Sequence, residues 1–227
     1  SSFNGGRYLC SGSADKTIRL WDVETSKSLY VFNGHMNGIW CVDISPLQNN
    51  NNNIGIIGGN GYTICSGSHD TTIRIWDIET TKQSIIFKGH ENVVRSVKYG
   101  SNKLENTILS GSEDKSVRLW DIRSGQQSQM FNGHKSEVWT VKYSPFIVKN
   151  IEFGGNSNVI CSGSRDGIIQ FWDIRSNKCE LHIIKEDHGI MCLTFFQLKK
   201  NMKNKNNGDC GINLCYSSFK GPICIWG

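Results

Sequence analysis

Three sets of serine, histidine and aspartate recur along the chain, and hydrolases use these residue types for nucleophilic attack. In a catalytic triad one exposed serine attacks the substrate, the histidine takes its proton, and the aspartate orients the histidine. Such chemistry needs one reactive serine beside one base. Here the set occurs three times, each with a tryptophan at the same offset, so the repetition favours a structural role and the sequence predicts no catalytic residue. The sets are Ser66, His35 and Asp70; Ser110, His90 and Asp114; Ser162, His134 and Asp166.

The sets belong to a segment that repeats along the whole chain. Four copies align without a gap: CSGSADKTIRLWD at 10–22, CSGSHDTTIRIWD at 65–77, LSGSEDKSVRLWD at 109–121 and CSGSRDGIIQFWD at 161–173. A weaker fifth copy, CYSSFKGPICIWG, occupies 215–227. Gly-His pairs precede copies two to four, at 34–35, 89–90 and 133–134, and Asp187-His188 reads as a degraded pair before the fifth. Self-similarity at this period is typical of stacked repeat folds.

Each unit contains short runs of Ile, Val, Trp and Tyr between Gly, Ser, Asp and Asn turns, which predicts strands. In the second unit the expected strands run from Ile39 to Ser45, Tyr62 to Ser66, Thr72 to Ile78 and Gln83 to Phe87. Polar inserts at 48–53, 146–158 and 199–211 fall between the first and second strands of their units. Such tracts cannot build a core, so we expect them to be loops. If the units are the blades of a propeller, these loops share one common face.

The repeated segments and Gly-His pairs resemble the WD40 family. The resemblance implies an all-β propeller with one four-stranded blade for each repeat, as a single domain over residues 1–227. Its units are approximately 1–33, 34–88, 89–132, 133–187 and 188–227. The first of these five blades is expected to lack its innermost strand and the last its outermost. Eighteen strands then fit a fragment of a seven-bladed ring whose N-terminal blades lie in a longer natural protein.

The resemblance also implies a structural tetrad in each complete blade. A buried indole N–H needs an acceptor, and in this family the tryptophan donates to a serine or threonine, which bonds a histidine, which bonds a turn aspartate. The tryptophans that match are Trp76, Trp120 and Trp172, joined to the three sets above. Unit one offers Ser11, Asp15 and Trp21 without a histidine. Unit five has Tyr216 and Lys220 where serine and aspartate should stand, so its network should be absent and its blade the loosest.

A partner site is implied in the same way. Partners of WD40 proteins commonly bind the narrow face, at residues near the start of the inner strands and just before the turn aspartate. Aromatic and arginine side chains at such a rim are typical of binding hot spots. The same side chains could instead line the channel or pack between blades. The matching positions are Trp40, Arg95, Glu137, Trp139, Met191, His69, Glu113 and Arg165.

Composition excludes several other classes of function. Lys and Arg exceed Asp and Glu by 25 to 20 with the signs interspersed, which is too mild for nucleic acid. The sequence has neither an apolar membrane-spanning window nor a signal peptide. Nine cysteines form no C-x-x-C pair, and Cys10, Cys65 and Cys161 stand inside apolar runs. We expect buried thiols in a reducing compartment, the cytoplasm or nucleus.

Nothing in the sequence indicates a metal site, a cofactor or a small-molecule substrate. The histidines of successive Gly-His pairs fall in different blades, and Gly58, Gly59 and Gly61 lack the lysine and helix of a phosphate-binding loop. The leading expectation is a non-catalytic protein–protein interaction scaffold in a multi-protein complex. The alternative is the propeller domain of a larger regulatory or enzymatic protein, such as a G-protein β-like signalling subunit or a histone or degron reader.

Overall fold

Five antiparallel sheets, one for each sequence unit, make up the computed structural model. It describes residues 2–3, 7–45, 62–101, 104–145, 158–175, 180–197 and 212–226. The first sheet holds β1 (Ser2–Phe3), β2 (Tyr8–Gly12), β3 (Thr17–Asp22) and β4 (Lys27–Asn33), and the second holds β5 (Ile39–Ile44), β6 (Thr63–Ser68), β7 (Ile73–Asp77) and β8 (Gln83–Phe87). The third holds β9 (Val94–Tyr99), β10 (Thr107–Ser112), β11 (Ser116–Asp121) and β12 (Gln126–Asn132). The fourth holds β13 (Val138–Tyr143), β14 (Val159–Ser164), β15 (Ile168–Asp173) and β16 (Glu180–Lys185), and the fifth β17 (Ile190–Gln197), β18 (Ile212–Ser218) and β19 (Ile223–Trp226).

The all-β prediction is confirmed, and one detail of the first unit is wrong. That unit was expected to lack its innermost strand, but β1 pairs with β2 through Ser2 with Leu9 and Phe3 with Tyr8. The exposed edge of β2 can pair with any extended backbone, whatever its side chains, so two residues suffice without a strand-like pattern. The fifth sheet has three described strands, as expected. The predicted inserts at 48–53, 146–158 and 199–211 lie outside the described residues except for Asn158, so their common face stays a prediction.

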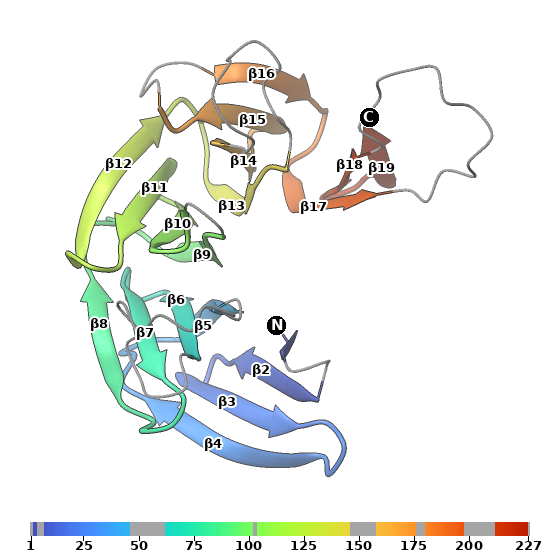
Figure 1. Ribbon diagram of the computed structural model, residues 1–227. Coiled ribbons are helices and arrows are strands. Elements are labelled where there is room, and N and C mark those ends of the chain that lie inside the picture. The colour runs from blue at the N-terminus through green and yellow to red at the C-terminus, as the bar shows by residue number, and fades with distance from the viewer. Residues whose placement is uncertain are drawn as a thin grey trace, which may run out of the picture.

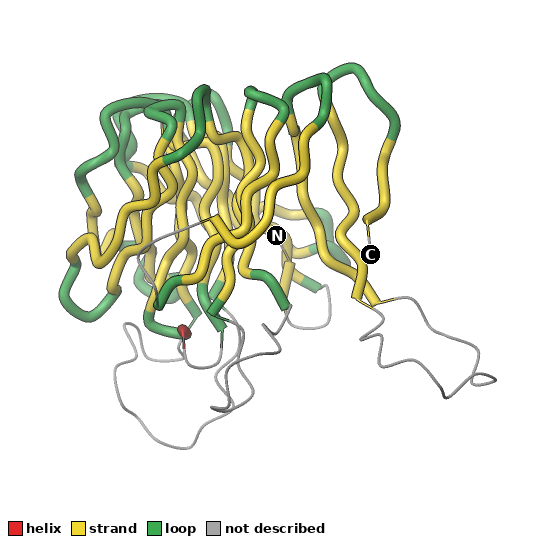
Figure 2. The backbone as a smooth tube through the Cα atoms, turned by 90° about the horizontal axis from the view of Figure 1, so that it is seen from above, coloured by secondary structure: helices red, strands yellow, loops and turns green. Residues whose placement is uncertain are grey.

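The sheets follow one another as blades around an open arc (Figure 1). Strands β5, β9, β13 and β17, the innermost of their blades, pack against one another in sequence along the concave side. Strands β4, β8, β12 and β16 form the convex side. Figure 2 shows the strands running between two layers of turns and loops. The arc is not closed, and a seven-bladed total stays a prediction.

The hydrophobic core lies between successive blades and not within any one of them. Four clusters fill the four interfaces, each combining residues of two neighbouring sheets. The cluster between the second and third blades, for example, joins Ile73, Ile75 and Phe87 to Val94 and Trp120. A sheet that is apolar on both faces must be covered on both, so each blade depends on its neighbours for stability.

Candidate functional site: the tetrads and the turn face

The structure brings each predicted set of tryptophan, serine, histidine and aspartate together in blades two, three and four. In blade three the Trp120 Nε1 donates to Ser110 Oγ at 2.8 Å, His90 Nε2 lies 2.7 Å from the same oxygen, and His90 Nδ1 lies 2.7 Å from Asp114 Oδ2. The same three distances are 2.8, 2.7 and 2.8 Å in blade two and 2.9, 2.7 and 3.2 Å in blade four. The network therefore repeats with little variation.

Donors and acceptors assign one tautomer to these histidines. Because the serine oxygen already accepts from the indole, its own O–H is free to donate to Nε2. The Nδ1–H then donates to the aspartate, and at His90 burial also favours this neutral form. The serine hydroxyls are closed to substrate, since Ser66, Ser110 and Ser162 have no exposed surface. A hydroxyl in that position has no access to a substrate carbonyl.

Turn geometry fixes the aspartates. The residue that follows each one, Lys16, Thr71, Lys115 or Gly167, has a left-handed φ between 67° and 77°. The side chain of Asp114 then accepts bonds from the backbone N–H and the hydroxyl of Ser116, at 3.0 and 2.6 Å. It also accepts from the amide of Glu91 in the loop that enters the blade, at 3.1 Å. One carboxylate thus ties the turn to the loop and to the histidine.

Burial and hydrogen bonding shift the pKa values of the tetrad aspartates and of His90 in opposite directions. Burial alone would raise the pKa of Asp114, but its bonds to His90 and Ser116 outweigh burial and hold the pKa well below its usual range. Asp70 follows the same pattern with His35 and Thr72. Burial lowers the pKa of His90, although Asp114 opposes the shift. The folded protein therefore favours the neutral His90 and the ionised Asp114.

These shifts predict acid sensitivity in two stages. Because the pKa of folded His90 lies below 6.5, the unfolded chain takes up its proton first, and stability falls as pH drops below that value. The stability that the ionised Asp114 contributes is complete above about pH 4 and is lost at lower pH. Urea unfolding between pH 8 and 2 should show both stages, the first below pH 6.5 and the second below about pH 4. Between pH 6.5 and 5, His90→Gln should reduce the slope of the free energy of unfolding against pH by the equivalent of up to one proton. An unchanged slope would contradict this assignment.

Blades one and five depart from the network in different ways. In blade one Trp21 Nε1 still donates to Ser11 Oγ at 2.9 Å, and Asp15 Oδ1 accepts from the Thr17 amide and hydroxyl at 2.9 and 2.6 Å. No histidine among the described residues joins them. In blade five the Tyr216 hydroxyl donates to Glu186 Oε1, so a tyrosine–glutamate bond replaces the tetrad. Whether this blade is the loosest stays a prediction.

In blade five Glu186 holds the position of the tetrad histidine. The prediction that Asp187-His188 is the degraded Gly-His pair of this blade is therefore wrong. Each tetrad histidine stands four residues before the first residue of its inner strand, as His35 does before Ile39. The same count from Ile190 reaches Glu186. The amide of Phe219 bonds the carbonyl of Gly189, as that of His69 bonds Gly38, which fixes the register. His188 consequently stands where blade two has Asn37, and it is exposed.

All eight predicted rim residues lie on one face, which we call the turn face. It consists of the turns between the second and third strands of each blade, the loops that enter the innermost strands, and the first two residues of those strands. Trp40, Arg95, Trp139 and Met191 are each the second residue of an innermost strand. His69, Glu113 and Arg165 begin the turns, and Glu137 directly precedes β13.

Some of these side chains form one cluster that crosses two blades. The Arg95 guanidinium carbon lies 3.8 Å above the centre of the Trp40 ring. Arg95 also donates through Nε to Glu113 Oε1 at 2.7 Å. Trp40 nevertheless remains 53% exposed. Trp40, Arg95 and Glu113 thus form an aromatic–arginine cluster whose upper surface faces solvent.

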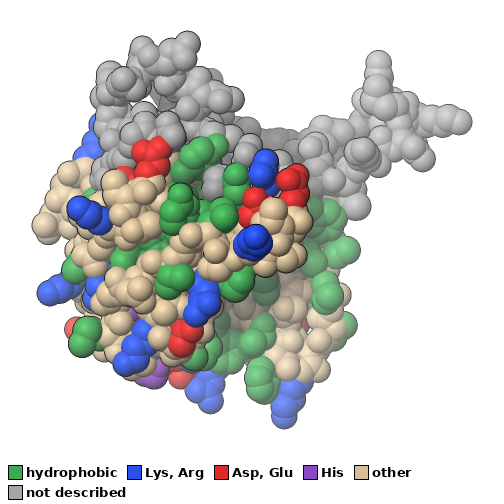
Figure 3. All heavy atoms as spheres, turned by 90° about the horizontal axis from the view of Figure 1, so that it is seen from below, with side chains coloured by type: hydrophobic (Ala, Val, Ile, Leu, Met, Phe, Trp, Pro, Cys, Tyr) green, Lys and Arg blue, Asp and Glu red, His purple; other side chains and the backbone are tan. Residues whose placement is uncertain are grey.

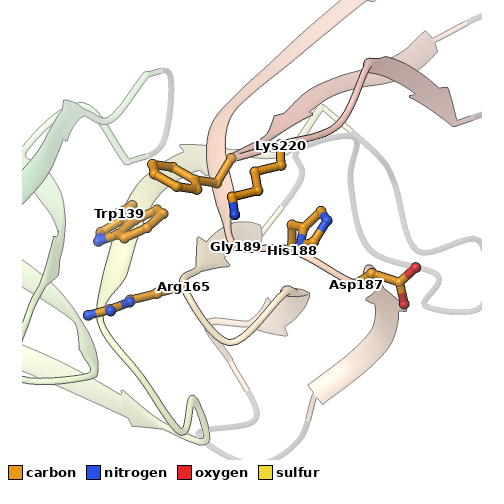
Figure 4. Close-up of a pocket in the computed structure, with 7 residues that line it drawn as sticks. Trp139, Arg165, Asp187, His188, Gly189 and Lys220 are labelled. Carbon is orange, nitrogen blue, oxygen red and sulfur yellow. The ribbon is translucent and has the colours of Figure 1, made fainter.

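A second group lies at the junction of blades four and five. Arg165 Nη1 donates to Glu137 Oε1 at 2.9 Å, and the hydroxyl of Ser136 together with Arg165 holds the pKa of Glu137 below its usual range. The Trp139 ring lies 6.3 Å from that of Phe219. Met191 and His69 are exposed and join neither group. A pocket of about 460 Å³ lies beside this group (Figure 4), lined by Trp139, Arg165, Asp187, His188, Gly189, Phe219 and Lys220.

Sequence reasoning missed Phe219, His188 and Lys220 as surface residues of interest. Phe219 holds the same turn position as His69, Glu113 and Arg165, so extending the pre-aspartate alignment into unit five would have found it. Lys220 was read only as a lost network residue. Its position is informative because it lies beside Trp139 in the folded chain.

Charge on the surface is mixed. Figure 3 shows one side of the molecule on which Lys and Arg side chains stand singly among acidic and apolar ones. Within the described ranges, no three His, Cys, Asp or Glu side chains gather so as to hold a metal ion. Nor does any helix there have the length and apolar character needed to cross a bilayer. The predicted burial of Cys10, Cys65 and Cys161 is confirmed.

Comparison with known proteins agrees with this architecture. The model for the WD domain, G-beta repeat, matches residues 2–22, 26–77, 81–121 and 125–173. Cell division control protein 4 of Saccharomyces cerevisiae is 30% identical over 183 residues, which cover 76% of this chain and 22% of that protein. The guanine nucleotide-binding protein subunit beta of Zea mays is 34% identical over 92 residues, 40% of this chain and 22% of that subunit.

Nuclear distribution protein PAC1 of Komagataella phaffii is 35% identical over 92 residues, which cover 39% of this chain and 16% of that protein. The matches therefore span about a fifth of the length of these relatives. The family model, in contrast, matches most of the chain, from the first blade to β15 of the fourth. Its boundaries coincide with the tryptophan–aspartate ends of β3, β7, β11 and β15. By its repeats, its blades and its tetrads, the chain belongs to the WD40 family.

Proposed function

We propose that this protein is a non-catalytic platform that holds a partner protein on its turn face. The observation that carries the proposal is the aromatic–arginine cluster. A tryptophan that is 53% exposed, held in place by a stacked arginine, is a preformed apolar contact surrounded by polar groups. Tryptophan and arginine at the centre of an interface are the residues most enriched among hot spots. A scaffold role within a multi-protein complex follows from this reading.

The tetrads support the non-catalytic part of the proposal. Their serines have no exposed surface and already accept a hydrogen bond from tryptophan. We assign these residues to blade stability. The rim arginines are assigned to structure as well, because Arg95 pairs with Glu113 and Arg165 pairs with Glu137. Neither cofactor nor small-molecule substrate forms part of the proposed role.

The related proteins favour regulation and assembly. One is named as a cell division control protein and another as a subunit of a guanine nucleotide-binding protein. The alternative function, a propeller domain within a larger regulatory protein, is compatible with matches that span about a fifth of those relatives. We locate the platform in the cytoplasm or nucleus. The seven described cysteines are free, and burial raises the pKa of Cys10 to about 12, which keeps that thiol protonated.

Trp40→Ala tests the proposal. Removal of a hot-spot tryptophan weakens binding by about 2 kcal/mol, or roughly thirty-fold. Stability should change much less, because the side chain is half exposed. The measurement is affinity purification of the tagged full chain with quantitative mass spectrometry, followed by the affinity of the captured partner for each variant.

Tyr30→Ala is the matched control. Tyr30 is also aromatic and 41% exposed, but it lies on β4 at the convex side of the arc. Its removal should leave capture unchanged. The platform function would be contradicted if no partner were recovered above background, or if Trp40→Ala and Tyr30→Ala reduced capture equally.

A further inference from the structure

Blade five lacks a carboxylate that the three complete blades possess. In those blades the turn aspartate accepts a hydrogen bond from the amide directly after the tetrad histidine. These bonds join Met36 to Asp70 at 2.8 Å, Glu91 to Asp114 at 3.1 Å and Lys135 to Asp166 at 2.8 Å. Ser217 pairs with Ile223 as Gly67 pairs with Ile73, so the register places Lys220 where blade two has Asp70.

The substitution leaves donors without an acceptor. The amide that corresponds to Met36 in blade five belongs to Asp187, and an ammonium group cannot accept its hydrogen bond. Among the described residues, the Asp187 amide meets no protein acceptor, and Lys220 takes part in no ion pair. The neighbouring Glu186 carboxylate accepts from Tyr216, and among the described residues it accepts from neither the Asp187 amide nor Lys220. Asp187 and Lys220 are both exposed and line the same pocket, so an N–H group and a positive charge without a protein acceptor face one solvent-filled space.

These donors lie at the pocket between blades four and five. Figure 4 shows the Lys220 ammonium reaching toward the space between the Trp139 and His188 rings, while Arg165 and Asp187 point away to opposite sides. Arg165 is held by Glu137, so Lys220 is the cation without a carboxylate partner in the described lining of the pocket. The Trp139 and Phe219 rings supply an apolar wall, and Phe219 is 62% exposed. One side of the pocket is cationic and the other is aromatic.

We propose that this pocket binds a glutamate or aspartate side chain of a partner protein, next to an apolar residue of the same segment. The carboxylate takes the place of the missing turn aspartate and accepts from the Lys220 ammonium and the Asp187 amide. The apolar neighbour packs on Trp139 and Phe219. The proposal rests on the platform function and names the chemistry of one segment that the platform recognises.

A carboxylate fits better than a phosphate for two reasons. The group that is missing from the blade is a carboxylate, and the two donors left without a protein acceptor, one ammonium and one amide, are a number that one carboxylate can satisfy. A phosphoserine carries close to two negative charges and three acceptor oxygens, whereas among the described lining residues one lysine without an ion pair, Lys220, faces the pocket. The aromatic wall further favours a segment that combines an acidic residue with an apolar one over a polyanion.

Three labelled heptapeptides test the chemistry on the full chain by fluorescence anisotropy. The first is acetyl-Gly-Ser-Leu-Glu-Phe-Ser-Gly-amide, the second carries glutamine in place of glutamate, and the third carries phosphoserine there. Loss of a charge-assisted hydrogen bond should weaken the glutamine peptide by about tenfold or more. The phosphoserine peptide should bind no better than the glutamate peptide. Equal binding of the glutamate and glutamine peptides, or preference for phosphoserine, would overturn the proposal.

Lys220→Asp supplies the missing carboxylate from within the chain. It should abolish binding of the glutamate peptide while the thermal unfolding midpoint of the protein stays the same or rises, because Asp187 regains an acceptor. Lys135→Ala is the control, since it removes a lysine from the corresponding loop of blade four, whose Asp166 is intact. Binding by Lys220→Asp at the original affinity, or an equal loss in Lys135→Ala, would refute the site.

The outcomes separate this site from the platform function. If Trp40-dependent capture of a partner persists while all three peptides bind alike, the carboxylate pocket is wrong and the platform stands. If the glutamate peptide binds in a Lys220-dependent manner but no partner is captured, the pocket stands and the platform fails.

Discussion

Trp120→Ala should destabilise the protein by about 3–5 kcal/mol, the range observed when a buried tryptophan is truncated. The indole is 1% exposed and fills the interface between blades two and three. It lies between the rings of Phe87, at 5.5 Å, and His90, at 5.7 Å. Truncation opens a cavity there and removes the indole N–H that donates a hydrogen bond to Ser110 Oγ. The free energy of unfolding, measured by urea titration, provides the test.

Trp21→Ala is the comparison for a tryptophan that has neither the full burial nor the histidine partner of Trp120. Trp21 keeps its bond to Ser11 at 2.9 Å but is only partly buried and has no histidine partner among the described residues. We expect it to lose about half as much stability or less. Equal losses in the two variants would contradict this expectation, because they would mean that neither the deeper burial of Trp120 nor its histidine partner adds stability.

The repeat allowed much of the fold to be predicted. Each Trp-Asp segment lies on the third strand of its blade, and the serine ten residues earlier falls on the paired second strand. Local spacing is enough for these positions because a hairpin fixes which residues face each other. The tetrad histidines come from a loop up to 35 residues away, and the family resemblance was needed to connect them.

Three features were beyond that reasoning, for different physical reasons. Strand β1 forms through backbone pairing, which leaves no pattern of side chains. In blade five the position of the tetrad histidine is held by Glu186, but the nearby His188 was taken for it. Counting back four residues from the start of the inner strand at Ile190 gives the correct position. The stacking of Arg95 on Trp40 joins two blades, and nothing local in either unit encodes a contact between them.

The second feature of large effect is the glycine within each Ser-Gly-Ser. A Cβ placed on Gly111 would lie 2.7 Å from Val138 Cγ1 and 2.8 Å from Val141 Cγ1, both on the inner strand of the next blade. Gly67 and Gly163 meet Val94 and Ile190 in the same manner, each at 2.6 Å. These approaches leave no space for a methyl group, so the glycines permit the blade-to-blade distance that the tetrad tryptophans require.

Gly111→Val should therefore destabilise the protein by about 3 kcal/mol, the upper part of the range for overpacking a core. If the cause is steric, Val138→Ala should make room for the new side chain. The further loss caused by Gly111→Val should then be smaller in that background, with a coupling of about 1 kcal/mol or more in a double-mutant cycle. Urea unfolding of the four proteins in the cycle measures it. If the losses in free energy of unfolding were additive, Gly111 would be needed for the backbone conformation of β10. The spacing of blades three and four would then be set by other contacts.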